Sequence, residues 1–197
     1  MSTSVSSRAS APPRAWSVPV TVLDFGGAAV GDTDAVASVA ATIVAEHARG
    51  VNVVALVPPY GQAARELSRL VAAVSSTPHP RELDLLGSSG AAMAAALCAM
   101  AVHRRGCRAI SLEGAQAGVL TDDTHTRARV LAVRTDRVLA ELRRHGIVLL
   151  SAIHGVARDT GEVTTLEPGG HEIVARALAE ALATSGCVVE SRALAAA

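Results

Sequence analysis

The sequence predicts an α/β fold in which helices cover both faces of a mainly parallel, doubly wound sheet. Short apolar runs, typical of strands buried in parallel sheets, alternate along the chain with longer segments of helical character. The 197 residues are half hydrophobic but include only three aromatic side chains, at Trp16, Phe25 and Tyr60. The core must therefore be built from Ala, Val, Leu and Ile, which suits helices packed closely on a sheet.

The first elements follow from two apolar runs and a helix cap. Residues 18–25 form an apolar run that ends at a Gly-Gly turn, and we expect a strand there. The segment Asp32 to Asp34 offers carboxylates to cap a helix that runs to about His47. Residues 51–57 have the composition of a second buried parallel strand.

The middle of the chain is expected to be mostly helical. A Pro-Pro-Tyr-Gly loop at 58–61 leads to a helix over 62–74. A longer helix is expected over 81–105, and residues 87–90 contain glycines at which it could be interrupted. Residues 107–112 are expected to form a third strand.

Beyond the third strand, the pattern changes before it returns to helix and strand. Residues 113–133 combine turn signals with alternating Val and Leu, which indicates a hairpin-like excursion. A helix over 134–145 and a buried strand over 147–152 follow. We expect a loop over 153–168 and then a helix that begins at Gly169-Gly170 and ends near Thr184.

The ends of the chain have a different composition from the interior. Val188-Val189 is expected to start a fifth strand. Residues 1–19 are rich in Ser, Ala and Pro without the apolar core of a secretory signal, so they are interpreted as a disordered tail. The expected organisation is therefore one domain over 20–190, with a second tail at 191–197.

Charge, hydropathy and cysteine usage limit the classes of partner. The formal net charge is zero and no basic stripe is evident, so we expect no nucleic-acid partner. No apolar run reaches transmembrane length, so we expect no membrane association. Cys98, Cys107 and Cys187 are odd in number and far apart, which favours reduced thiols and a cytoplasmic location.

Loops at the carboxyl ends of parallel strands meet at one edge of a sheet, where ligands usually bind. In the predicted topology these loops are 24–32, 58–62, 113–118 and 153–172. They carry Asp24, His154, His171 and Glu172, which we predict as catalytic acid/base residues. The start of the last helix would favour a neutral His171 that can accept a proton. The simpler interpretation, in which Glu172 complements the helix dipole and His171 is a surface cap, is equally open.

Further residues, from these loops and from the 88–89 segment, are predicted to bind a small-molecule substrate. They are Gly26, Gly27, Tyr60, Ser88, Ser89, Glu113, Gln116, Glu167, Gly169 and Gly170. Tyr60 could donate a hydrogen bond or stack on a ring, although an ordinary loop position fits it as well. The chemically reactive set could also bind zinc or iron, but there is no local spacing motif, so no metal and no cofactor are predicted.

Several short segments, in one consistent order, resemble the aspartokinases, which belong to the amino-acid kinase family. Residues 24–30 resemble the family's Lys-Phe-Gly-Gly-Ser-Ser-Val, and residues 81–84 match its Arg-Glu-Leu-Asp. Residues 114–119 resemble Gly-Ser-Gln-Ala-Gly-Val, with a Thr-His pair a few residues later, and 153–156 resemble Phe-Gln-Gly-Val. Residues 164–172 lie where the family has Thr-Thr-Leu-Gly-Arg-Gly-Gly-Ser-Asp. The resemblance covers roughly 20–190 and implies a three-layer sandwich.

The resemblance also implies differences at positions that serve phosphoryl transfer. Asp24 stands where the family has its active-site lysine, and a carboxylate there would repel polyphosphate. Ala28 and Ala29 replace serines, Ala91 replaces a substrate-binding glutamate, and Pro168 replaces an arginine. The family holds its nucleotide mainly in a C-terminal half, followed by regulatory ACT domains. We therefore expect a truncated domain that keeps only the N-terminal, acceptor-binding half.

From these differences we expect loss of ATP-dependent phosphotransfer. The preferred hypothesis is a repurposed acid/base enzyme of the isomerase, lyase, dehydratase or cyclase type, in specialised metabolism. One alternative is a non-catalytic pseudokinase that pairs with another enzyme, and a second is a sensor of an amino acid or small anion. A homodimer is expected by resemblance, with a partner enzyme as a further possibility.

Overall fold

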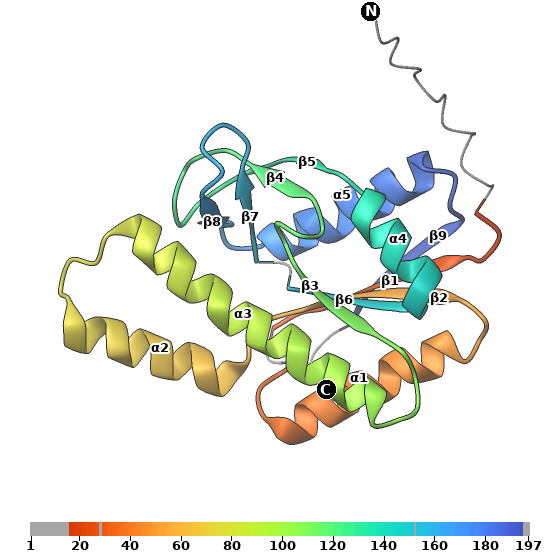
Figure 1. Cartoon of the computed structure of the whole chain (residues 1–197). Helices are drawn as coiled ribbons and strands as arrows, with labels where there is room; N and C mark the ends of the chain where they lie inside the picture. The colour runs from red at the N-terminus through yellow and green to blue at the C-terminus, as the bar shows by residue number, and fades with distance from the viewer. Residues whose placement is uncertain (1–15, 28, 152, 195–197) are drawn as a thin grey trace, which may run out of the picture.

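A five-stranded sheet, in which all neighbouring strands run parallel, forms the centre of the molecule (Figure 1). The computed structural model describes residues 16–27, 29–151 and 153–194. The strand order is β3-β6-β2-β1-β9. The strands are β1 (Val20–Phe25), β2 (Asn52–Val57), β3 (Ile110–Glu113), β6 (Ile147–Ser151) and β9 (Val189–Leu194).

Helices cover both faces of this sheet because alternate strand residues point to opposite sides. Leu23 and Phe25 pack with α1 (Thr33–His47) and α3 (Pro80–His103) on one face. Val22 packs with α4 (Asp136–His145) and α5 (Gly170–Thr184) on the other. The helix α2 (Gly61–Val74) lies beside α3. The predicted three-layer α/β architecture is therefore confirmed.

A smaller mixed sheet lies beyond the carboxyl edge of the central sheet, in the order β5-β4-β7-β8. Its strands are β4 (Val119–Thr121), β5 (Val130–Val133), β7 (His154–Ala157) and β8 (Val163–Thr165). The antiparallel β4–β5 pair confirms the expected hairpin-like excursion. The expected loop over 153–168 was wrong, because β7 and β8 are strands. Each is only three or four residues long, which leaves little local sequence signal. β8 pairs with β7, and β7 pairs also with distant β4.

The helix α3 is continuous, so the expected interruption at residues 87–90 was wrong. A glycine inside a helix costs only about 1 kcal/mol relative to alanine, and Gly90 is buried close to Leu67 of α2. This helix is long and apolar enough to cross a membrane by length and composition alone. Its buried residues, however, pack against α1 and the sheet, as expected of a core helix.

The described ends and the cysteines add two findings. The strand β9 reaches Leu194, into the segment expected as a tail, whereas most of the expected N-terminal tail lies outside the described residues.

All three cysteines are free thiols. Burial raises the pKa of the Cys98 thiol to about 12, which keeps it protonated and unreactive.

Candidate functional site

The candidate site lies where the end of β1 meets the start of α5. The chain leaves β1 through Gly26 and Gly27, and Gly27 has φ 59°, a left-handed conformation that favours glycine. The residue before α5, Gly169, is also left-handed with φ 83°. Of the first three N–H groups of α5, those of Gly170 and Glu172 donate to the carbonyls of Glu167 and Gly169 at 2.8 and 3.1 Å. The N–H of His171 is the donor that has no such partner among the described residues.

The side chain of Asp24 is buried at the end of β1. Its position in the strand alternation places it on the α4 and α5 face, and it is 5% exposed. Its Oδ1 atom has no hydrogen-bond partner within the described part of the chain. Burial raises the pKa of Asp24, the nearby His171 lowers it, and Glu172 raises it, with a net upward shift. The fold therefore favours the neutral carboxyl group.

His171 and Glu172 occupy the first turn of α5 and complete this group. A Cβ atom added at Gly26 would lie 3.7 Å from Nε2 of His171, so the half-buried imidazole rests against the turn after β1. Glu172 is exposed and places its charge near the helix N-terminus, where it complements the dipole. The structure thus brings together Asp24, His171, Glu172 and the Gly26 turn, a set that can bind an anion and exchange protons.

His154 follows the carboxyl end of β6 closely in the sequence, but its side chain is enclosed within the molecule. It is 0% exposed in β7, and neither ring nitrogen has a hydrogen-bond partner among the described residues. Burial lowers the pKa of His154 to about 4, so the ring is neutral at physiological pH. Contact between loop 113–118 and β7 is tight, because a Cβ at Gly114 would lie 1.7 Å from the His154 carbonyl oxygen.

The remaining predicted ligand-binding residues are spread over several environments. Tyr60 is 9% exposed and packs in the core on the α1 and α3 face. The hydroxyl groups of Ser88 and Ser89 donate to carbonyl oxygens one turn earlier in α3. The Gln116 side chain accepts a hydrogen bond of 3.0 Å from the backbone N–H of Glu113. The half-buried Glu167 accepts from the N–H of Gly170 through its carbonyl oxygen.

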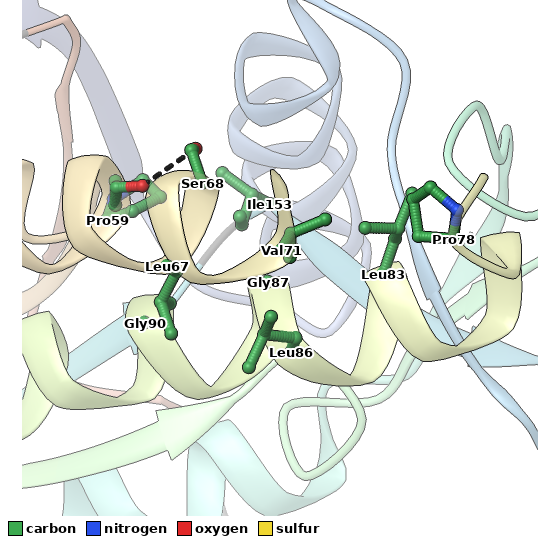
Figure 2. A pocket seen from close by; sticks show the side chains of 11 residues that line it. Pro59, Leu67, Ser68, Val71, Pro78, Leu83, Leu86, Gly87, Gly90 and Ile153 are labelled. Atoms are coloured by element: carbon green, nitrogen blue, oxygen red, sulfur yellow. Dashed lines mark hydrogen bonds between the residues drawn. The ribbon is translucent and has the colours of Figure 1, made fainter. Parts of the chain in front are cut away.

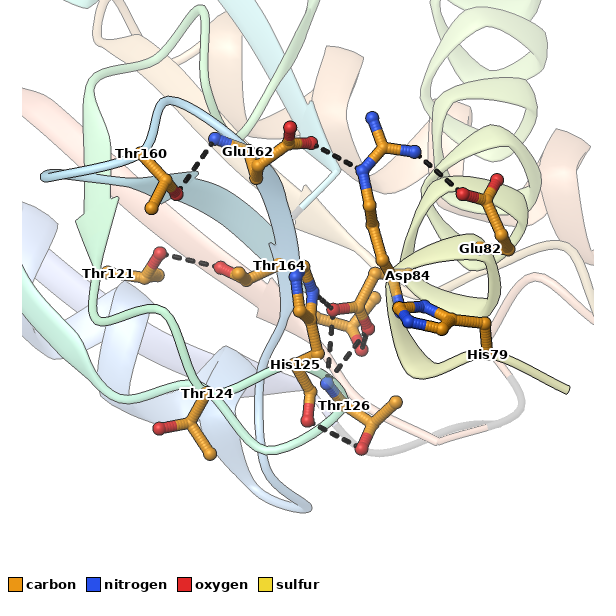
Figure 3. Close-up of polar contacts among 12 residues, drawn as sticks. His79, Glu82, Asp84, Thr121, Thr124, His125, Thr126, Thr160, Glu162 and Thr164 are labelled. Atoms are coloured by element: carbon orange, nitrogen blue, oxygen red, sulfur yellow. Dashed lines mark hydrogen bonds and ion pairs between the residues drawn. The ribbon is translucent and has the colours of Figure 1, made fainter.

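A polar cluster around Asp84 was not predicted as part of a site (Figure 3). Asp84 is fully buried in α3 and accepts hydrogen bonds from three groups: Nδ1 of His125 at 2.6 Å, the backbone N–H of Thr126 at 3.0 Å, and the hydroxyl of Thr165. Both Asp84 and His125 lie within family-like segments, which was the one available signal. Nothing local in the sequence indicates that they meet.

An apolar groove between α2 and α3 was also not predicted (Figure 2). Its volume is about 410 Å³, and the Ser68 hydroxyl on its wall already donates to the Ala64 carbonyl at 2.9 Å. The groove is lined by Pro59, Ala64, Leu67, Ser68, Val71, Pro78, Leu83, Leu86, Gly87, Gly90 and Ile153. Within the described residues, no three His, Cys, Asp or Glu side chains lie together in a way that could hold a metal ion.

Comparison with known proteins places this architecture in a family. The model of the amino acid kinase family matches residues 19–190, from the start of β1 into β9. The chain belongs to the amino acid kinase family. It is 38% identical over 168 residues to the aspartokinase of Geobacillus stearothermophilus, with 85% of this chain and 41% of that protein covered. The Mycobacterium tuberculosis aspartokinase is equally similar, with 40% of its length covered.

Solved structures of the amino acid kinase family agree with this assignment. The aspartate kinase from Synechocystis has a TM-score of 0.68 and 32% identity, covering 83% of this chain and 26% of that chain. E. coli aspartokinase III, solved with aspartate and ADP, has a TM-score of 0.69 at 20% identity, covers 88% of this chain and 49% of that chain, and supports the fold alone. The chain thus spans about 40% of the length of the curated aspartokinases it matches.

These relatives overturn the functional hypothesis drawn from the sequence. A repurposed acid/base enzyme without ATP was expected, with a non-catalytic pseudokinase or a sensor as alternatives. Relatives at 38% identity are aspartokinases, which points to a kinase. The replacement of individual family residues, such as the lysine by Asp24, was given too much weight against similarity that extends over 85% of the chain.

Proposed function

We propose that this chain binds an acidic amino acid, aspartate first, as the phosphoryl acceptor in an aspartokinase-type reaction with ATP. The observation that carries the proposal is the 38% identity to aspartokinases over 85% of the chain. E. coli aspartokinase III, which shares the fold, binds aspartate and ADP. Because this chain spans only part of its relatives' length, the activity of a whole aspartokinase is itself a part of the proposal.

The geometry at the end of β1 supports an anion-binding role. In phosphoryl transfer a protein mainly positions the two substrates and stabilises the negative charge of the phosphoryl group. The N–H of His171 in the first turn of α5 and the open glycine turn at Gly26 and Gly27 are suited to this, since an anion can approach their backbone closely. His171, half-buried against the same turn, is in reach of a ligand there.

Asp24 is compatible with an anionic ligand when its carboxyl group is protonated. A neutral carboxyl group can donate a hydrogen bond to a phosphate or carboxylate oxygen, whereas the ionised form repels both. The raised pKa of Asp24 increases the neutral population in the folded chain. Activity is therefore expected to fall as the pH rises and Asp24 loses its proton.

The test is aspartate-dependent formation of ADP by the wild type and by Asp24→Lys and Asp24→Asn. A cation at this position would attract the transferring phosphoryl group, so Asp24→Lys is expected to increase kcat/KM by about tenfold or more. Asp24→Asn is expected to remove the loss of activity with rising pH. Glu180→Gln, an exposed carboxylate further along α5, is the matched control and should leave the rate unchanged.

Isothermal titration with aspartate separates binding from turnover. Binding of aspartate without ADP formation, in the wild type and in Asp24→Lys, would contradict the phosphotransfer step but keep the acceptor site. Absence of both would contradict the proposal as a whole. We also propose that the protein is cytoplasmic and forms a homodimer. Light scattering after size-exclusion chromatography gives the mass of the eluting species and so tests the dimer. A monomer at all concentrations would contradict the dimer.

A further inference from the structure

Asp84 joins three segments that are far apart in the sequence. It lies in the second turn of α3. Its carboxylate accepts hydrogen bonds from Nδ1 of His125, the backbone N–H of Thr126 and the hydroxyl of Thr165. It is fully buried, so its charge depends on these donors instead of on water. The loop around residue 125 and the end of β8 are thereby fixed to α3 (Figure 3).

The loop at Thr126 has a backbone conformation that needs such support. Thr126 has φ 64°, and it is the single non-glycine residue with positive φ in the described part of the chain. A β-branched residue is strained in this region. Its N–H points to both carboxylate oxygens of Asp84, at 3.0 and 3.1 Å. The shape of this loop therefore depends on Asp84.

Both fixed segments continue directly to the start of α5. The N–H of Ala128 donates to the carbonyl of Thr165 at 2.9 Å, and Ala128 forms a β-bridge with Leu166. Leu166 packs so closely under the first turn of α5 that a Cβ at Gly170 would come within 2.3 Å of the Leu166 Cβ atom. The next residue is His171, whose ring rests against Gly26 in the candidate site.

We propose that Asp84 is a positioning residue for the candidate site: through Thr126 and Thr165 it sets the place of the first turn of α5, and so of His171 relative to the Gly26 turn. Its effect on catalysis rests on the proposed phosphotransfer, but its effect on His171 does not. A second connection between α3 and the small sheet, Arg81 to Glu162 at 2.9 Å, is partly exposed and leads to the β7–β8 turn, away from α5.

The experiment uses matched pairs of variants. Thr165→Val removes one hydroxyl that donates to Asp84, and Thr164→Val removes the neighbouring hydroxyl, which instead bonds Thr121 at 2.6 Å. Asp84→Asn removes the buried charge, and Glu141→Gln removes another nearly buried carboxylate, on α4, that pairs with Arg137. The readouts are the NMR signals of the His171 ring, assigned with His171→Gln, and the kinetics of aspartate-dependent ADP formation.

The expected result is a shift of the His171 signals in Thr165→Val and Asp84→Asn, but not in their two controls, at a temperature where all are folded. kcat/KM should fall by about tenfold to a hundredfold in the first two, since small displacements of positioned groups cost that much, and remain near the wild-type value in the controls. Unmoved His171 signals, or equal movement in Thr164→Val, would overturn the proposal. If Asp84→Asn does not fold, Thr165→Val decides, and if no variant forms ADP, the NMR signals decide alone.

Discussion

At the scale of single residues, His154 should make the fold sensitive to acid. Its pKa is about 4 in the folded chain against an ordinary value of 6.5, so the unfolded chain binds the proton more readily between these values. The contribution of the neutral His154 ring to the free energy of unfolding is fully present above about pH 6.5 and is lost as the pH drops toward 4. The loss at pH 4 is about 3 kcal/mol, from 1.4 kcal/mol for each pKa unit. Urea unfolding of the wild type and His154→Gln, across this range, measures it.

His154→Gln is the matched variant because its amide stays neutral at every pH. Between pH 7 and pH 4, the free energy of unfolding of His154→Gln should fall by about 3 kcal/mol less than that of the wild type. Equal pH dependence of the two proteins would show that the buried imidazole does not titrate in this range. The sequence placed His154 among the catalytic candidates; its enclosure depends on packing in β7, which no local pattern reveals.

Asp24 should have the opposite dependence on pH. The pKa of Asp24 is raised in the folded chain, so the protonated carboxyl group stabilises the fold. This stabilisation is fully present below about pH 3.8, the ordinary pKa, and is lost as the pH rises through the folded-state pKa. Asp24→Asn should therefore melt at the same temperature as the wild type near pH 3 and at a higher temperature near pH 7. A thermal melting series over this range measures the difference. A constant difference between the two proteins would argue against a raised pKa.

At the scale of helices and strands, the elements that were predicted are those with a signal in their own sequence. The side chain of Asp32 caps α1 by accepting from the N–H of Ala35 at 2.9 Å, as its position before an apolar helix indicated. The short strands β7 and β8 were missed because each has only three or four residues, and because β7 takes one of its two partners from distant β4. The cluster at Asp84 was missed for the same reason, since its partner His125 is 41 residues away.

The helix α2 should be the least stable helix of the fold. It has no buried residue and no side-chain cap, and Leu70 and Val74 on its surface are 44% and 86% exposed. Few buried apolar contacts imply a low free energy of local opening. Hydrogen exchange should be about tenfold or more faster in α2 than in α1, which has nearly the same length, a cap at Asp32 and five buried residues. Equal protection of the two helices would contradict this prediction.

At the scale of the whole molecule, two apolar cores share a single sheet. Leu149 and Leu150 are neighbours in β6, both 0% exposed, yet Leu149 packs with α1 and α3 and Leu150 packs with the α4 and α5 layer. The strands β1, β2 and β6 each contribute buried residues to both cores through this alternation. If the shared strands couple the cores, neither can unfold while the other persists, and the domain behaves as one cooperative unit.

The single tryptophan makes this coupling measurable. Trp16 packs beside the α4 and α5 core, with the Arg143 guanidinium 4.9 Å from its ring centroid, so its fluorescence reports on that layer. Leu149→Ala and Leu150→Ala should each lower the free energy of unfolding by about 2–5 kcal/mol. In a cooperative domain, Leu149→Ala must shift the Trp16 transition in urea as far as it shifts the circular dichroism transition. A Trp16 transition that moves only with Leu150→Ala would mean that the two layers unfold separately, since the cavity left at Leu149 lies wholly in the opposite core.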